Sequence, residues 1–204
     1  AFALTLDQQV ALKFLPADVE QDPDRLERFL NEVRTSLKVT HPNICRVYDV
    51  GQIDQRHFLS MEYVDGEDLA SLLRRIGRLP EDKAVEIARQ LCAGLAAAHD
   101  EGVLHRDIKP ANIMIQQGTD VKISDFGAAL LKKTQAVHTE VMGSPYYMSP
   151  EQIEEKELTH HSDMYSLGVV LYELLAGAPP FDQKELRSKA RREIQRIIRE
   201  EDPP

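Results

Sequence analysis

The stretch from residue 105 to residue 112, His-Arg-Asp-Ile-Lys-Pro-Ala-Asn, constrains this chain more than any other part of it. It places a carboxylate, an amide and three potential cations between apolar segments, and such a density of charge does not belong in a core. Asp107 can accept a proton from a hydroxyl group, Lys109 can neutralise a phosphoryl group in transfer, and Asn112 can offer an oxygen to a hard cation. The stretch therefore indicates a site that handles phosphate.

A second polar motif, Asp125-Phe126-Gly127, follows a short apolar run that reads as a strand. Its carboxylate would bind Mg²⁺ across the site from Asn112, because carboxylate and amide oxygens suit that cation. The two motifs together describe a site for a phosphate group and its metal ion.

The spacing H-R-D-x-x-x-x-N followed by D-F-G is the signature of protein kinases, and on these residues the sequence resembles the eukaryotic-like serine/threonine protein kinases. Residues 105–112 and 148–152 (Met-Ser-Pro-Glu-Gln) are most similar to the bacterial branch of that family. The resemblance runs from about residue 10 to about residue 181. It implies an α+β fold with two lobes, a small β-rich N-lobe with one helix and a larger, mainly helical C-lobe, and ATP and Mg²⁺ as cofactors.

Composition excludes several other classes. Lys plus Arg number 25 and Asp plus Glu number 34, and the resulting net charge of −9 argues against a nucleic-acid-binding surface. Cys45 and Cys92 form no C-x-x-C pair and favour a reducing compartment. No apolar run approaches the roughly 18 residues of a membrane span, and no signal peptide opens the chain. We expect a cytoplasmic protein, or the cytoplasmic part of a longer one, without nucleic-acid partners or membrane segments.

Residues 9–15 read as a strand that carries one lysine, Lys13, in an apolar run. By resemblance, Lys13 binds the α and β phosphates of ATP and Ala11 lines the nucleotide pocket. Taken alone, Lys13 reads equally well as a lysine that snorkels to the surface.

Asp22 and Pro23 predict a helix start, with the aspartate as N-cap and the proline at the first helical position. Apolar residues then recur at helical spacing and predict one buried stripe, made of Leu26, Phe29, Leu30, Val33 and Leu37. Glu32 lies beside this stripe, and by resemblance it pairs with Lys13. Without the resemblance it reads as a solvated helix residue.

Two further strands are expected over residues 45–50 and 57–63, joined across Gly51 and polar residues. By resemblance, Met61 is the gatekeeper of the nucleotide pocket, the backbone of Glu62 and Val64 holds the adenine, and Met114 also lines the pocket. Without the resemblance, these residues fit equally well with an ordinary strand that ends in a glycine turn.

Pro80 begins a long predicted helix with one apolar face, and this helix leads into residues 105–112. The face consists of Ala84, Ile87, Ala88, Leu91, Leu95 and Ala98. A hairpin over residues 113–115 and 121–123 follows and brings Asp107, Asn112 and Asp125 toward one cleft. Residues 162–177 predict a second apolar helix, capped by Ser162 and Asp163, in which Asp163 must be hydrogen-bonded and by resemblance braces the catalytic loop.

Residues 125–151 correspond by resemblance to the activation segment. Thr134 and Thr139 are the candidate phosphate acceptors, and Arg106 is the guanidinium that would bind the added phosphate. Two unmodified loop threonines are the alternative. By resemblance, Ser144 falls in the segment that seats the substrate, and with Lys109 it fits serine/threonine specificity.

The stretch from residue 183 to 202 predicts a helix with one apolar side and one basic and acidic side. Interspersed glutamates favour a solvated face over an acidic-partner or nucleic-acid surface. His160 and His161 are adjacent, so their rings should point apart, and we predict no zinc site.

The sequence departs from the family at both ends. Twelve residues precede Lys13 and the first glycine is Gly51, so the Gly-rich loop over the ATP phosphates is missing. The chain also stops before the final helices of the large lobe. We expect a partial kinase domain over residues 1–204, apparently truncated at both ends, with an N-lobe over residues 1–63 and a C-lobe over residues 64–204.

The sequence therefore predicts a kinase that transfers the γ-phosphoryl group of MgATP to Ser or Thr of protein substrates, among them a second copy of itself by autophosphorylation. Asp107, Lys109, Lys13 and Glu32 would carry catalysis, and Asn112 and Asp125 would bind Mg²⁺. Two alternatives remain open, a weakly active or inactive pseudokinase that serves as a scaffold, and a small-molecule phosphotransferase of related fold.

Overall fold

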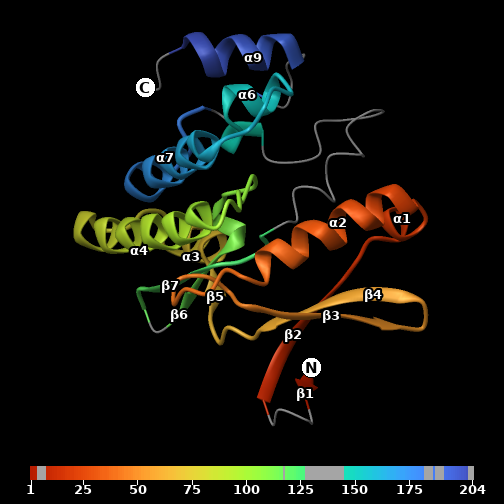
Figure 1. Cartoon of the computed structure of the whole chain (residues 1–204). Helices are drawn as coiled ribbons and strands as arrows, with labels where there is room; N and C mark the ends of the chain where they lie inside the picture. Colours follow the sequence, from red (N-terminus) through yellow and green to blue (C-terminus); the bar gives the residue numbers. More distant parts are fainter. Residues whose placement is uncertain (4–7, 117, 127–144, 182–185, 187–190, 202–204) are drawn as a thin grey trace.

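The computed structural model describes residues 1–3, 8–116, 118–126, 145–181, 186 and 191–201 (Figure 1). A β-sheet with one long helix forms one end of the molecule and a mostly helical part forms the other, so the predicted two-lobed α+β fold is confirmed. The two ends of the chain lie at opposite ends of the molecule (Figure 1).

The small-lobe sheet is antiparallel and has the strand order β1-β2-β4-β3. Its strands are β1 (Phe2–Ala3), β2 (Gln8–Phe14), β3 (Val47–Ile53) and β4 (Arg56–Glu62). Strand β2 confirms the strand expected around Lys13 and pairs Lys13 with Leu59 and Ala11 with Met61. Because side chains alternate along a strand, Ala11 and Lys13 share one face of the sheet.

The turn between β3 and β4 differs from the expectation. Gly51 lies inside β3, opposite Phe58, and a Cβ atom added to it would lie only 2.3 Å from the Phe58 ring. The chain reverses instead at Asp54 and Gln55, whose φ angles of 49° and 62° lie in the left-handed region used by tight hairpin turns. Gly51 therefore provides space for an aromatic ring and does not form the turn.

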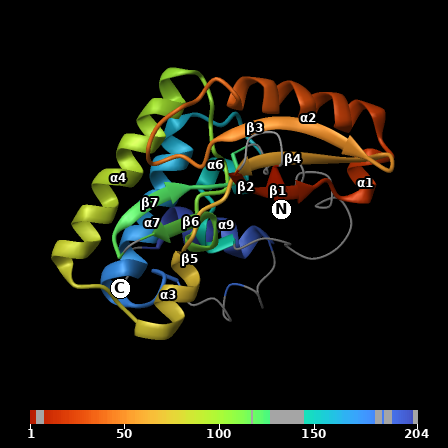
Figure 2. The same ribbon diagram turned by 90° about the horizontal axis from the view of Figure 1, so that it is seen from below.

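Helix α2 (Pro23–Ser36) follows the short helix α1 (Ala17–Glu20) and covers the sheet along β3 and β4 (Figure 2). The Asp22 carboxylate accepts hydrogen bonds from the N–H groups of Asp24 and Arg25 at 3.1 and 3.2 Å, which confirms the predicted cap. The predicted stripe also faces the sheet. Phe29 and Val33 of this stripe are buried in the small-lobe core, and Leu26, Leu30 and Leu37 pack against it. The other buried residues of this core are Leu15, Val19, Cys45, Leu59, Met61 and Val64.

The connection from α2 to β3 ties the small lobe to the large one. Val39 and Ile44 are buried in the large-lobe core, and Ile44 forms a parallel bridge with Ile123. The second crossing is at Gly66, where an added Cβ would lie 2.1 Å from the carbonyl oxygen of Ile115. Only glycine allows the two backbones to approach this closely.

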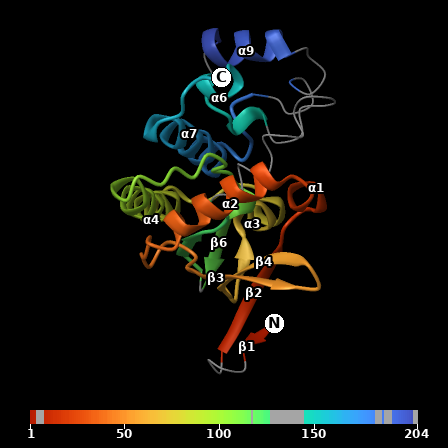
Figure 3. The same ribbon diagram turned by 45° about the vertical axis from the view of Figure 1, so that its right-hand side comes forward.

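The large lobe contains a small sheet with the order β5-β6-β7, formed by β5 (Glu67–Asp68), β6 (Ile113–Gln116) and β7 (Asp120–Ile123). The β6–β7 pair is the predicted hairpin. Helix α3 (Leu69–Ile76) follows β5, and helix α4 (Glu81–Asp100) buries the predicted apolar face except for the half-buried Ala88. The short helices η1 (Pro110–Asn112), η3 (Pro145–Tyr147) and α6 (Pro150–Ile153) precede α7 (His160–Ala176) and α9 (Arg191–Glu200). Figure 3 shows α6 and α9 beyond α7, on the side away from the small-lobe sheet.

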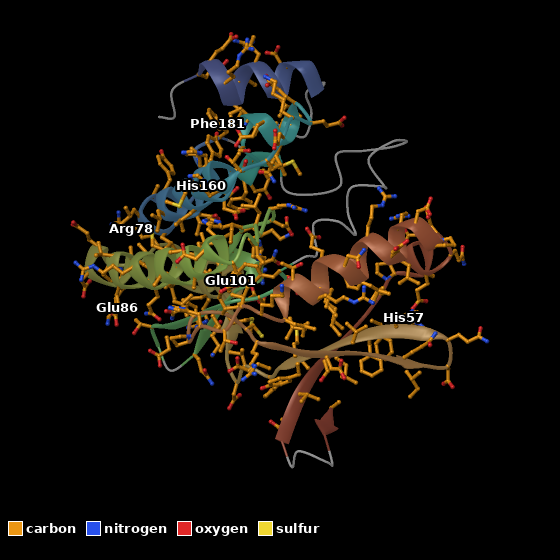
Figure 4. All side chains as sticks on the ribbon, in the orientation of Figure 1. His57, Arg78, Glu86, Glu101, His160 and Phe181 are labelled. Carbon is orange, nitrogen blue, oxygen red and sulfur yellow. The ribbon has the colours of Figure 1, made fainter. Side chains whose placement is uncertain are left out.

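Helix α7 corrects three details of the prediction. It begins at His160, two residues early, because Thr159 and Ser162 form a capping box, and it ends at Gly177 with φ 84°. It is not buried all round, since Met164 and Leu175 are exposed. The rings of His160 and His161 do not point apart, because their centroids lie 4.0 Å from each other. Figure 4 labels His160 on α7 in the large lobe and His57 on the small-lobe sheet.

In the described part of the predicted C-terminal helix, α9 covers Arg191–Glu200 and packs its apolar side on the large-lobe core through Ile194, Ile197 and Ile198. On its outer side, the guanidinium of Arg196 binds the carboxylates of Glu193 and Glu201 at 2.9 and 2.8 Å. These pairs support the solvated-face interpretation. Among the helices in the described ranges, none combines the length and hydrophobicity needed to cross a bilayer.

Candidate active site

The loop between α4 and η1 brings three of the predicted residues together at Asp107. The Oδ2 atom of Asp107 accepts hydrogen bonds from Lys109 Nζ and from Asn112 Nδ2, each at 2.9 Å. Asn112 Nδ2 also donates to the Asp107 carbonyl oxygen at 2.8 Å. With its nitrogen turned to Asp107, Asn112 has its amide oxygen available for a hard cation.

Asp163 of α7 holds the backbone of this loop, as predicted. Its carboxylate accepts hydrogen bonds from the N–H groups of His105 and Arg106 at 2.8 and 2.7 Å, and from Nε2 of His99 at 2.8 Å. The side chain is only 1% exposed. Burial raises the pKa of Asp163, but the bond from His99 and the two backbone bonds outweigh it, so the pKa is lowered and the carboxylate stays charged.

His105 connects the loop to the second motif. Its ring is fully buried, lies 2.7 Å from the Ser124 carbonyl oxygen through Nε2, and accepts the Asp107 N–H at Nδ1 with a length of 3.2 Å. Burial lowers the pKa of His105, so the imidazole is neutral, with its proton on Nε2. The ring also meets Phe126 edge-on at 4.7 Å.

Asp125 meets the small lobe at Lys13. The Nζ atom of Lys13 lies 2.6 Å from Oδ1 of Asp125, so the strand lysine and the predicted Mg²⁺ ligand share one site between the lobes. The two side chains line a small cavity of about 10 Å³. It is lined by Lys13, Phe29, Cys45, Val47, Leu59, Met61, Asp125 and Phe126.

The structure corrects the expected pairing of Lys13 with Glu32. Glu32 forms its ion pair with Nη1 of Arg106, while Lys13 binds Asp125. Two carboxylates and two cations in a small volume can pair in either way, and each pair gains attraction from its partly buried position. Sequence spacing does not decide between the two arrangements.

The predicted adenine-binding residues gather around the small-lobe core. Met61 is buried, and Ala11 and Met114 pack against the same core. The N–H of Glu62 donates to the Arg46 carbonyl oxygen at 2.8 Å, and the thiol of Cys45 donates to the Glu62 carbonyl oxygen at 3.2 Å. That carbonyl oxygen retains a second lone pair for a ligand.

Gln152 of α6 is one of two residues that the sequence interpretation missed. Its Nε2 atom donates to the Arg106 carbonyl oxygen at 2.7 Å, and its Oε1 atom accepts the Ser149 N–H at 2.9 Å. The spacing Ser149-x-x-Gln152 is a capping-box signal, but it gives no sign of the bond to Arg106. His99 is the second residue that the sequence interpretation missed. Its only signal in the sequence is that a polar side chain directly follows the buried Ala98.

Three predicted residues, Thr134, Thr139 and Ser144, lie outside the described residues. Within the described ranges, no group of three or more His, Cys, Asp or Glu side chains is arranged to hold a metal ion. The predicted Mg²⁺ ligands are a smaller set, one amide and one carboxylate, and Mg²⁺ commonly binds through one or two carboxylates plus substrate phosphates.

Comparisons with known proteins point to one family. The protein kinase domain family matches residues 2–203. The chain is 40% identical over 194 residues to the serine/threonine-protein kinase PrkC of Bacillus subtilis, covering 94% of this chain and 30% of that protein. It is 40% identical over 185 residues to the serine/threonine-protein kinase PknB of Mycobacterium leprae, covering 87% of this chain and 30% of that protein.

Solved structures agree. The crystal structure of the Mycobacterium tuberculosis PknI kinase domain superposes with a TM-score of 0.70 at 30% identity, covering 85% of this chain and 66% of that chain. The chain thus spans about a third of the length of the curated relatives it matches and about two thirds of a solved domain.

Proposed function

The chain belongs to the protein kinase family, and on that premise we propose that it transfers the γ-phosphoryl group of MgATP to serine and threonine hydroxyls of proteins. The proposal rests on the ion pair of 2.6 Å between Lys13 and Asp125. This pair lies beside the cluster formed by Asp107, Lys109 and Asn112. These are the cation, the carboxylates and the amide that the reaction needs, collected from both lobes.

The donor set fits a magnesium nucleotide. The amide oxygen of Asn112 and the carboxylate of Asp125 are hard oxygen ligands that would hold Mg²⁺, and the Lys13 ammonium would bind the α and β phosphates. When bound, Mg²⁺ neutralises charge on the phosphates. Ala11, Met61 and Met114 would enclose the adenine ring, and the backbone of Glu62 and Val64 would hydrogen-bond to it.

The residues of the loop act on the acceptor. Asp107 would accept the hydrogen bond of the substrate hydroxyl and take up its proton, and the bonds from Lys109 and Asn112 fix the carboxylate for this role. Lys109 then neutralises charge on the phosphoryl group as it moves. Catalysis would thus consist of positioning and charge neutralisation, without a covalent intermediate.

Regulation would act on Arg106. In the structure Arg106 holds Glu32, so a phosphate on Thr134 or Thr139 would compete with Glu32 for the same guanidinium. Glu32 released in this way would be able to orient Lys13. We also assign Ser144 to the seating of the substrate.

The setting of the reaction follows from its chemistry. ATP and the free thiols of Cys45 and Cys92 support a cytoplasmic location. Protein substrates would include a second copy of this chain. We assign a small lobe to residues 1–63 and a large lobe to residues 64–204; the two hydrophobic cores follow this division except for Val39 and Ile44, which join the large-lobe core, and Val64, which joins the small-lobe core.

The test is transfer of ³²P from γ-labelled ATP to a protein substrate, followed by phosphoamino-acid analysis. The wild-type chain should form phosphoserine or phosphothreonine. Asp107→Asn should lose activity by about a hundredfold or more while it still binds ATP. A wild-type chain with no more transfer than Asp107→Asn would contradict the proposal.

A further inference from the structure

We propose that Gln152 is a positioning residue for phosphoryl transfer, acting through the backbone of the catalytic loop. This inference rests on the proposed function. Its basis is the hydrogen bond of 2.7 Å from Gln152 Nε2 to the carbonyl oxygen of Arg106, the residue that precedes Asp107. Gln152 itself does not touch the Asp107 carboxylate.

The peptide unit that Gln152 contacts is held on both sides. Its carbonyl oxygen, from Arg106, accepts the Gln152 amide, and its N–H, from Asp107, donates to Nδ1 of His105 at 3.2 Å. The orientation of this peptide plane sets the direction in which the Asp107 side chain leaves the backbone. Gln152 therefore provides one of the two hydrogen bonds that hold the peptide unit before Asp107.

Arg106 needs such support because its backbone is strained. Its φ of 65° lies in the left-handed region, which is costly for a residue other than glycine and persists only where the surroundings fix it. The Asp163 carboxylate fixes the N–H side of Arg106 at 2.7 Å, and Gln152 fixes the carbonyl side. Without the Gln152 bond, the Asp163 carboxylate alone would hold the Arg106 backbone in this conformation.

The same side chain ties the loop to the segment assigned to the substrate. Gln152 Oε1 accepts the Ser149 N–H at 2.9 Å, and the neighbouring Glu151 carboxylate accepts the Ser162 hydroxyl of α7. Gln152 thus joins α6 and the loop through two atoms of one amide. Loss of this link would misplace Asp107 relative to the acceptor hydroxyl and leave the Lys13–Asp125 ion pair intact.

The two roles of Gln152 use different atoms, so one substitution separates them. Gln152→Glu keeps an oxygen that can cap α6 but removes the N–H that donates to Arg106, because a glutamate carboxyl with its ordinary pKa of about 4.3 carries no proton at pH 8. A residue that only capped the helix would lose nothing in this variant.

Gln90 provides a matched control. Its Nε2 donates to the Thr119 carbonyl oxygen at 2.7 Å, and its Oε1 accepts the Val121 N–H at 2.9 Å, so it bridges two backbone groups as Gln152 does, at the β6–β7 hairpin and outside the site. Its Oε1 also accepts a bond from Asn43 Nδ2 at 2.9 Å. Gln90→Glu should lower the melting temperature without changing kcat at a temperature where the variant is folded.

The first measurement is steady-state kinetics at pH 8. Gln152→Glu should lower kcat by about tenfold or more with KM for ATP within about twofold of wild type. Gln152→Met, which has neither a donor nor a charge, should show a similarly low kcat and so exclude the added charge as the cause.

A second measurement reads the bond directly and does not depend on activity. Arg106-Asp107 is the only Arg-Asp dipeptide in the sequence, so labelling with ¹³C-carbonyl arginine and ¹⁵N-aspartate gives a single carbonyl–amide correlation from this peptide unit. The Arg106 carbonyl signal should shift in Gln152→Glu and in Gln152→Met and stay in place in Gln90→Glu.

The outcomes separate the two proposals. A wild-type chain without phosphoryl transfer would contradict the proposed function, and the carbonyl signal would still decide whether Gln152 positions the loop. An unmoved carbonyl signal, or unchanged kcat in an active enzyme carrying Gln152→Glu, would overturn the role of Gln152.

Discussion

Glu32 of α2 binds the guanidinium of Arg106, the residue that precedes Asp107 in the catalytic loop. The contact joins the helix of the small lobe to the loop of the large lobe. It also leaves Lys13 with a different partner, since the lysine lies 2.6 Å from Asp125. The two ion pairs place four of the predicted site residues at the boundary between the lobes.

The Glu32–Arg106 pair should be measurable as a coupling energy. In a double-mutant cycle with Glu32→Gln, Arg106→Gln and the double variant, urea unfolding should give a coupling of about 1 kcal/mol, because both side chains are partly shielded from water. The cycle cancels whatever each substitution does to other contacts. Additive losses of stability would contradict the ion pair.

Asp163→Asn should destabilise the protein by about 3 kcal/mol. The amide supplies one acceptor oxygen where the carboxylate supplies two, so a buried N–H of His105 or Arg106 is left without its partner. Urea unfolding measures the loss. Asp82→Asn, in the exposed first turn of α4, is the control and should change stability by less than about 0.5 kcal/mol. An equally small effect at Asp163 would show that the loop does not depend on this brace.

Stability should fall as the pH decreases below about 6.5, the pKa of an unfolded histidine. Burial lowers the pKa of His105 in the folded protein, so between the two values the unfolded chain binds a proton that the folded chain does not. The free energy of unfolding is therefore fully retained above pH 6.5 and declines below it by up to about 1.4 kcal/mol per pH unit.

The control for this pH dependence is the exposed His160. His160→Asn should retain the decline between pH 6.5 and pH 5, because the buried imidazole is still present, and His105→Asn should flatten it. Equal slopes in the two variants would show that His105 is not responsible.

Cys45 should resist alkylation in the folded protein. Burial, helped by the charge of Glu62, raises the pKa of its thiol to about 12, and the thiolate is the reactive form. Treatment with iodoacetamide at pH 8, read by mass spectrometry, should label the exposed Cys92 and spare Cys45 until urea is added. Labelling of Cys45 at the rate of Cys92 would contradict the burial of Cys45 against the Glu62 carbonyl oxygen.

Local signals in the sequence predicted much of the fold. The Asp22 cap, the stripe of α2 and the β6–β7 hairpin depend on neighbouring residues and on hydrophobic periodicity, and all appear in the structure. Errors arose where tertiary contacts decide. Gly51 reads as a turn but makes room for the Phe58 ring, and α7 begins at a capping box that the apolar pattern does not include.

The candidate site shows the same division. The sequence placed Asp107, Asn112 and Asp125 in one cleft because short segments connect them, and the brace from Asp163 was expected by resemblance. It did not predict that Glu32 binds Arg106, because the choice between two cations depends on how α2 lies on the large lobe. Nor did it predict the bond from Gln152, which joins segments 46 residues apart.

The central claim is that Lys13 of the small lobe and Asp125 of the large lobe bind one magnesium nucleotide, and calorimetric titration of ATP in the presence of Mg²⁺ tests it most directly. Lys13→Met and Asp125→Asn should each weaken binding by about tenfold or more. Lys83→Met should leave it unchanged, because Lys83 binds Glu86 on the exposed face of α4. Affinity equal to wild type in both Lys13→Met and Asp125→Asn would contradict the account.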